Sequence, residues 1–206
     1  MIENIKKELY SKKIVIIIVL TIFLIGLLFG SIYITVVDKA SKKEIATSVT
    51  NYINSYNNIK FSTRLNIFKQ TLGKNSFFFI SMWALGLSII GIPLILIMIF
   101  FKSFTIGFSI GSIFGTYKFK GILYLLIYLI EGPLITSILS IILGIYSINV
   151  SIKLVYNVFL KKNLNFQTFM GKYLFMIMIT FLILVFLSLF DSFISPILYK
   201  LIKNML

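Results

Sequence analysis

The stretch that decides the fold is an apolar run near the amino end, Ile14–Val37, which reads IVIIIVLTIFLIGLLFGSIYITVV. A helix of about 20 apolar residues crosses a hydrocarbon core of roughly 30 Å, so this run is long enough to span a membrane. A signal peptide has an apolar region of only about 7–15 residues, followed by a small-residue cleavage site. Neither feature is present, and we predict a retained transmembrane anchor at residues 14–37.

The composition extends this conclusion to the whole chain. Of its 206 residues, 59% are hydrophobic and 13% are charged, and the mean hydropathy is +1.02. Soluble domains are about half apolar and a quarter charged. The sequence therefore predicts an all-α, polytopic membrane helix bundle with about five transmembrane helices. The net charge of +14 would suggest nucleic acid in a soluble protein, but for this chain we expect membrane lipids and no nucleic acid.

The residue types also limit the chemistry. The chain has no His and no Cys, which excludes imidazole acid–base catalysis, thiol nucleophiles, disulfides and the usual zinc sites. Outside the amino-terminal tail the acidic residues are Asp38, Glu44, Glu131 and Asp191, no two of them close in sequence. Paired carboxylates and a phosphate-binding glycine loop are both missing. We expect neither an enzyme nor a cofactor or metal site.

Hydrophilic segments flank the first span. Residues 1–13 form a basic tail, which we expect to be cytoplasmic and, because Ile2, Ile5 and Leu9 recur at helical spacing, to lie on the membrane surface as an amphipathic helix. Residues 38–75 carry apolar side chains at steps of three and four, which is typical of two amphipathic helices. We expect them to form an extracytoplasmic helical hairpin. Two interpretations stay open for it: packing on the membrane surface, or docking of a partner protein.

Two apolar segments follow the hairpin. Residues 76–101 are the predicted second span, kinked at Pro93 because proline removes a helical hydrogen bond. Lys102 separates them from residues 103–117, the predicted third span. At about 15 residues the third span would give only ~22 Å of helix. It would therefore thin the bilayer or fail to cross fully.

Glycines line one face of two of these spans. Gly107, Gly111 and Gly115 recur at four-residue spacing in the third span, and Gly26 and Gly30 do so in the first. Small residues at this spacing let helix backbones approach closely inside a membrane. We predict helix packing through both faces, within the chain or against a partner, and a homo-oligomer is one alternative.

The predicted fourth span, residues 121–149, is broken by Glu131-Gly132-Pro133. A carboxylate at membrane depth costs about 2.5–3.5 kcal/mol on insertion scales, so Glu131 is a candidate for a transport or proton-moving residue. The alternative is that the helix break accommodates the carboxylate, because the backbone groups freed at such a break, together with water, can form hydrogen bonds with it. Residues 150–171 form a basic connector and residues 172–190 the fifth span. Ser195 as N-cap and Pro196 begin an interfacial helix over residues 195–206.

Two motifs in the chain are distinctive. The first is WALGLSIIGIPL, from Trp83 to Leu94, with FKSFTIGFSIG from Phe101 to Gly111, and the second is SLFDSFISP at residues 188–196. Both resemble the stage II sporulation protein M family, and the residues that carry the resemblance are Trp83, Gly86, Gly91, Pro93, Lys102, Gly107, Phe108, Gly111, Asp191, Ser195 and Pro196. The chain departs from the family at Ser103, where glycine is usual. Near the helix break only Glu131 and Pro133 could remain of a proline-histidine-glycine…glutamate-x-proline motif.

The resemblance implies a non-enzymatic membrane scaffold for engulfment during sporulation, located in the septal membrane of the mother cell. Such a scaffold recruits stage II sporulation protein P, a cell-wall amidase and endopeptidase. That enzyme in turn holds stage II sporulation protein D, a lytic transglycosylase, so the partners carry out septal peptidoglycan degradation. Two alternatives remain. One is a permease-like subunit moving a solute or ion along the broken fourth helix, and the other is a membrane protein of the same fold outside sporulation.

Overall fold

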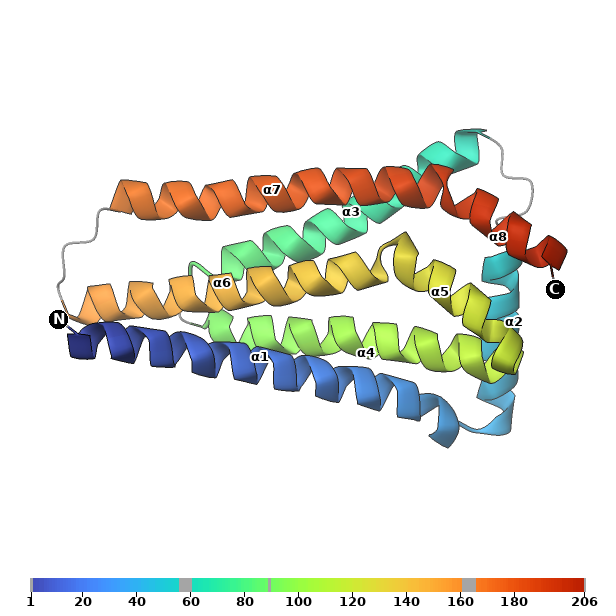
Figure 1. The fold of residues 1–206 in the computed structure, drawn as a ribbon, viewed down its shortest axis with the longest axis horizontal. Coiled ribbons are helices and arrows are strands. Elements are labelled where there is room, and N and C mark those ends of the chain that lie inside the picture. Colours follow the sequence, from blue (N-terminus) through green and yellow to red (C-terminus); the bar gives the residue numbers. More distant parts are fainter. Residues whose placement is uncertain (1, 56–60, 89, 161–165, 206) are drawn as a thin grey trace.

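The computed structural model describes residues 2–55, 61–88, 90–160 and 166–205, and within them the chain is helical without strands. Its elements are α1 (Ile2–Val36), α2 (Lys39–Ser55), α3 (Phe61–Leu85), α4 (Gly91–Tyr117), the short 3-10 turn η1 (Lys118–Lys120), α5 (Gly121–Glu131), α6 (Pro133–Leu160), α7 (Phe166–Phe193) and α8 (Ser195–Met205). The chain runs along the bundle in α1, α3, α4, the α5–α6 pair and α7, while α2 and α8 lie together at one end (Figure 1). The predicted all-α membrane fold is confirmed.

Among the residues that the structure describes, four segments are long and apolar enough to cross a membrane, namely Lys13–Val36, Gly91–Glu131, Pro133–Val155 and Met170–Leu201. Large apolar side chains stay exposed on their outer faces, among them Phe29, Phe101 and Phe186. Outside a membrane such a surface would be an aggregation hazard. These faces are therefore suited to contact lipid.

The predicted second span, residues 76–101, needs correction, because these residues belong to two antiparallel helices. The chain turns between α3 and α4, with the Leu87 and Ser88 N–H groups donating to the Ala84 and Leu85 carbonyls at 3.1 and 3.0 Å. A Cβ added to Gly91 would lie 1.7 Å from the Leu85 carbonyl oxygen, so the turn leaves no room for a side chain there. Pro93 stands in the first turn of α4, where proline is tolerated, and does not kink a span.

The predicted boundary at Lys102 is also wrong. α4 is continuous over 27 residues, which corresponds to ~40 Å of helix, so residues 103–117 are not a short span of their own. Lys102 lies in the middle of this helix and is half-buried. Charged residues inside membrane segments normally face the protein interior, and this one does so.

The predicted hairpin at residues 38–75 is only half correct. α2 does lie across the end of the bundle (Figure 1), but the expected second amphipathic helix is the first part of the long helix α3. Asp38 caps α2, because its Oδ2 accepts the N–H groups of Ala40 and Ser41 at 3.1 and 3.3 Å. The Ser41 hydroxyl and backbone N–H hold the pKa of Asp38 below its ordinary value of 3.8.

The carboxyl-terminal half follows the predicted order with different bounds. The predicted break at Gly132 is present, since α5 ends at Glu131 and α6 begins at Pro133. α6 extends to Leu160 and α7 begins at Phe166, so most of the predicted connector at residues 150–171 is helical, and residues 161–165 lie outside the described residues. α8 begins as predicted, but the buried Ser195 hydroxyl has no hydrogen bond among the described residues and does not cap it.

Two apolar clusters hold the bundle together. The larger one joins α1, α3, α4, α6 and α7, and its buried members are Val15, Val19, Phe79, Met82, Ile95, Ile99, Leu143, Ile148 and Leu184. The smaller one lies at the end covered by α2 and α8, and its buried members are Ile53, Ile113, Tyr124, Ile127 and Tyr199. The aromatic hydroxyls in the smaller cluster mark the transition from an apolar core to a polar site.

Candidate functional site

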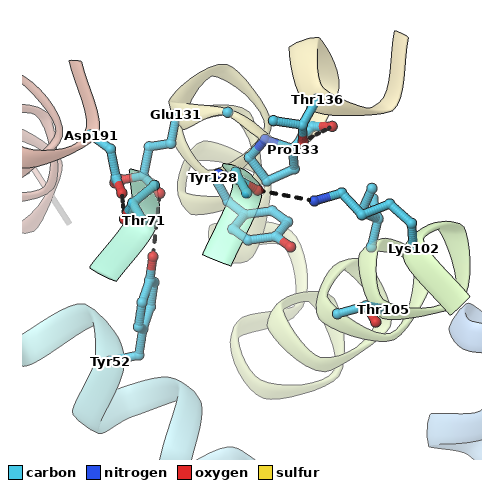
Figure 2. Close-up of a pocket in the computed structure, with 12 residues that line it drawn as sticks. Tyr52, Thr71, Lys102, Thr105, Tyr128, Glu131, Pro133, Thr136 and Asp191 are labelled. Carbon is cyan, nitrogen blue, oxygen red and sulfur yellow. Dashed lines mark hydrogen bonds between the residues drawn. The ribbon is translucent and has the colours of Figure 1, made fainter. Parts of the chain in front are cut away.

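A cavity of about 200 Å³ lies beside the break between α5 and α6 (Figure 2). Its lining comes from helices α2 to α7 and consists of Tyr52, Thr71, Asn75, Lys102, Thr105, Ile106, Tyr128, Glu131, Gly132, Pro133, Thr136 and Asp191. All of these except Ile106, Gly132 and Pro133 have polar side chains. A chain that is mostly apolar thus gathers polar groups from helices far apart in sequence at one place.

The helix break places Glu131 in this cavity. Pro133 has no N–H and cannot continue the hydrogen-bond ladder of α5, so the chain passes through Gly132 in an extended φ of 168° before α6 begins. The new helix starts with the Thr136 N–H donating to the Gly132 carbonyl at 2.7 Å. Glu131 is the last residue of α5, and its side chain is only 4% exposed.

Tyrosines hold one oxygen of the Glu131 carboxyl. The hydroxyls of Tyr199 and Tyr52 donate to Oε2 at 3.2 and 3.4 Å, and their two rings meet edge to face with centroids 6.3 Å apart. The Ser195 hydroxyl lies close enough to this carboxyl to act on it as a hydrogen-bond donor, although its hydrogen bond does not have normal geometry. The other oxygen, Oε1, is buried and has no hydrogen-bond partner among the described residues.

Asp191 brings a second carboxyl to the same wall. The Thr71 hydroxyl donates to Asp191 Oδ2 at 2.7 Å, which links α3 to α7. The carboxyls of Asp191 and Glu131 are near enough to interact electrostatically, and Figure 2 shows both on one side of the cavity. The structure therefore pairs two acids that lie far apart in sequence.

Lys102 supplies a positive charge on the other side of the cavity (Figure 2). Its Nζ donates to Asn75 Oδ1 at 3.4 Å and lies 5.3 Å from the centroid of the Phe78 ring, within reach of a cation–π interaction. Both partners belong to α3. The ammonium group is thus held by α3, apart from the two carboxyls.

The predicted glycine faces lie elsewhere, against each other. A Cβ on Gly26 would lie 2.1 Å from Ser103 Oγ, and one on Gly30 would lie 2.1 Å from the Phe104 carbonyl oxygen. From α4, a Cβ on Gly107 would lie 2.1 Å from the Leu27 carbonyl oxygen. The other two glycines of α4 are packed less tightly. A Cβ on Gly111 would lie 2.9 Å from the Ser31 carbonyl oxygen, and one on Gly115 would lie 3.6 Å from Ile34 Cγ2. The two faces therefore form the contact between α1 and α4.

The first family motif builds a structural joint near the turn between α3 and α4. Tyr173 of α7 stacks on Trp83 with centroids 5.3 Å apart, and its hydroxyl donates to the Trp83 carbonyl at 2.6 Å. A Cβ on Gly86 would lie 2.1 Å from this hydroxyl. Phe108 packs near Tyr33 of α1 at 6.1 Å between ring centroids. Trp83, Gly86 and Phe108 therefore pack helices together and do not line the cavity, whereas Lys102 of the same motif does.

Sequence reasoning identified Glu131 as a candidate and assigned Lys102, Asp191 and Ser195 to the family resemblance, but it did not bring these residues together. It also missed the tyrosines, although Tyr52 lies on the expected inner face of α2 and Tyr199 on α8. A tyrosine on an amphipathic helix is common, so only the carboxyl that it meets distinguishes it. That carboxyl lies 79 positions away from Tyr52 and 68 from Tyr199.

Comparison with known proteins gives a match to a protein family. The model of the family described as Stage II sporulation protein M matches residues 19–196. No curated protein and no solved structure matches the chain. The matched residues contain the glycine faces, the turn between α3 and α4, and the residues that line the cavity.

Proposed function

Because this match covers most of its length, the chain belongs to the Stage II sporulation protein M family and is a sporulation membrane protein, and we propose that it is a non-enzymatic scaffold for engulfment. In this role it recruits septal peptidoglycan-degrading enzymes and places them in the septal membrane of the mother cell. The partners expected from the resemblance are stage II sporulation proteins P and D.

The observation that carries the proposal is the position of α2. This amphipathic helix lies across one end of the bundle (Figure 1), where it buries Ile53 and half-buries Val49 against the bundle. Its opposite face leaves Lys43, Thr47 and Asn51 exposed. A partner outside the lipid would meet this polar face without disturbing the bundle.

The direction of the chain fits an extracytoplasmic partner. α1 begins at one end of the bundle and α2 follows at the other (Figure 1). With the amino-terminal tail in the cytoplasm, as we expect from the sequence, α2 faces the wall. Enzymes that degrade peptidoglycan work on that side.

Partner recovery tests this function. A tagged chain is extracted in mild detergent from sporulating cells, and stage II sporulation proteins P and D are measured in the eluate. We expect the wild type to recover both and a triple variant, Lys43→Ala, Thr47→Ala and Asn51→Ala, to recover at least tenfold less at equal membrane abundance. The matched control is Lys120→Ala, exposed on η1 at the same end, which should recover both normally. Recovery of neither enzyme by the wild type would contradict the scaffold role.

A second candidate function is favoured by the polar cavity. Intramembrane acids commonly mark solute or ion paths, so a permease-like subunit could use Glu131 at the helix break. The variant Glu131→Gln separates the two functions. A scaffold should still support engulfment, whereas a permease should lose flux in liposomes that contain the purified protein.

A further inference from the structure

The starting point is an unmet hydrogen-bond acceptor inside the cavity. Glu131 is 96% buried, since only 4% of it is exposed, and its Oε1 has no hydrogen bond of normal geometry among the described residues, although the Ser195 hydroxyl, also without such a bond, interacts with the same carboxyl. Buried polar atoms in native proteins nearly always have a partner, so an exception calls for an explanation. A ligand with a donor group at this oxygen would provide one.

The acidic and basic groups around the cavity lie on different sides of it. Glu131 and Asp191 stand on one side, and Lys102 stands on the other, where Asn75 and Phe78 hold it (Figure 2). The carboxyl side favours a cationic group, and the ammonium side favours an anionic one. The cavity therefore has an acidic side and a basic side.

This arrangement disfavours ligands with a single charge. The described part of the chain has no group of three or more acidic, His or Cys residues able to hold a metal ion, and Lys102 would repel a bare cation. A simple anion would gain at Lys102 but meet two carboxyls across the cavity. A molecule with an ammonium group at one end and a carboxylate at the other complements both sides.

Size and access fit a compact molecule. The cavity of about 200 Å³ is smaller than the ~300–1,000 Å³ typical of sites for drug-sized ligands. The hydroxyls of Thr105, Tyr128 and Thr136 line it as additional hydrogen-bonding groups. Tyr52 lines it too and is 43% exposed, so the cavity reaches the end of the bundle that α2 covers.

We propose that this cavity binds a small zwitterion of the amino-acid class. The ammonium group of the ligand donates to Glu131 Oε1 and lies beside Asp191, and its carboxylate faces Lys102. Tyr52 and Tyr199 position the Glu131 carboxyl for this contact by holding Oε2. Nothing in this inference depends on the scaffold role.

Binding is tested on the purified full-length protein in detergent, by isothermal titration calorimetry and by the midpoint of thermal unfolding. Three zwitterions with increasing charge separation serve as probes: glycine, β-alanine and γ-aminobutyrate. Ethylamine and propionate carry the two charges separately. We expect at least one zwitterion to bind saturably and raise the midpoint, with each single-charge probe binding at least tenfold more weakly. Three results would overturn the proposal: no zwitterion binds, ethylamine binds equally well, or propionate binds equally well.

Variants locate the site. We expect Glu131→Gln and Lys102→Met each to weaken binding of the zwitterion at least tenfold, whereas Lys120→Met, exposed on η1, leaves it unchanged. Undiminished binding to a folded Glu131→Gln variant would place the ligand elsewhere and overturn the assignment. The comparison of probes needs only the wild type, so it remains decisive if Lys102→Met does not fold. Partner recovery by Glu131→Gln should be normal, which separates failure here from failure of the scaffold proposal.

Discussion

Two regions that share helix α4 are built in opposite ways. Toward α1, α4 presents Gly107 and Gly111, and the backbones touch so closely that a Cβ on Gly107 would collide with the Leu27 carbonyl. Toward α3, α5 and α6, α4 presents Lys102 and Thr105 to a hollow lined by polar groups. We call the first region the glycine interface and the second the polar cavity.

The difference reflects what stabilises each contact within lipid. Apolar lipid tails provide no hydrophobic drive between helices, so close packing of small residues holds α1 on α4. Polar side chains are costly at membrane depth and remain only where they face the interior and meet one another. Substitutions that add volume should therefore destabilise the protein at the glycine interface. In the polar cavity, substitutions that remove a hydrogen bond or a charge should do so.

Added volume at the glycine interface should have the largest effect. A leucine at Gly30 would push into the Phe104 carbonyl and the Phe108 N–H, which a Cβ would approach to 2.1 and 2.7 Å. Because these are backbone atoms, α4 must shift, and we expect Gly30→Leu to destabilise the protein by at least about 1–3 kcal/mol. The measurement is the thermal unfolding midpoint in detergent. The control is Gly115→Ala, where the nearest neighbour is a side-chain methyl at 3.6 Å; equal midpoints for the two variants would contradict the interface.

Loss of a hydrogen bond in the polar cavity should have the next largest effect. Tyr199→Phe removes the hydroxyl that donates to Glu131 Oε2, and we expect a loss of about 1–3 kcal/mol because the carboxyl is buried. A double-mutant cycle with Glu131→Leu, which leaves no acceptor for the hydroxyl, tests whether the two groups act together. If the two groups interact, the loss in free energy of unfolding in the double variant differs from the sum of the losses in the two single variants by about 0.5 kcal/mol or more. Strict additivity would show that this hydrogen bond is unimportant.

The two regions should also differ in their tolerance of one methyl group. A Cβ on Gly132, beside the cavity, meets nothing within 4 Å, and its extended φ of 168° is open to other residues. We expect Gly132→Ala to change the free energy of unfolding by no more than about 0.5 kcal/mol. Gly107→Ala, in the glycine interface, should be clearly destabilising. A reversed order of the two midpoints would refute the contrast between the regions.

The smallest effect lies outside both regions, at the start of α2. The pKa of Asp38 is below 3.8 in the folded protein, so its capping contribution is present above that pH and is lost as the pH falls through the lowered pKa. Hydrogen exchange at the amides of Ala40 and Ser41 should then speed up, while exchange in α1 and α4 stays unchanged. Asp38→Asn keeps a capping side chain and should abolish this pH dependence. Persistence of the dependence in that variant would assign it to another group.

Particular residues show how far sequence reasoning reaches. The break at Glu131–Pro133 was predictable, because proline lacks the N–H that a helix interior needs. The turn between α3 and α4 was not, because Leu87 and Ile90 keep the hydropathy high on both sides of it. A helix boundary was predicted at Lys102, because a charge within an apolar run is expected at a membrane surface. The structure instead turns this side chain inward.

The sequence by itself determined that the chain is a helical membrane protein, which helix faces carry the small residues, and which family motifs it contains. These properties follow from composition and local periodicity, which act along one helix at a time. Only the tertiary structure decided that the two glycine faces meet each other, and that Glu131, Asp191 and Lys102 surround one cavity. Periodicity tells which side of a helix is buried, but the partner on that side depends on how all the helices pack, and that is fixed by contacts between residues far apart in the chain.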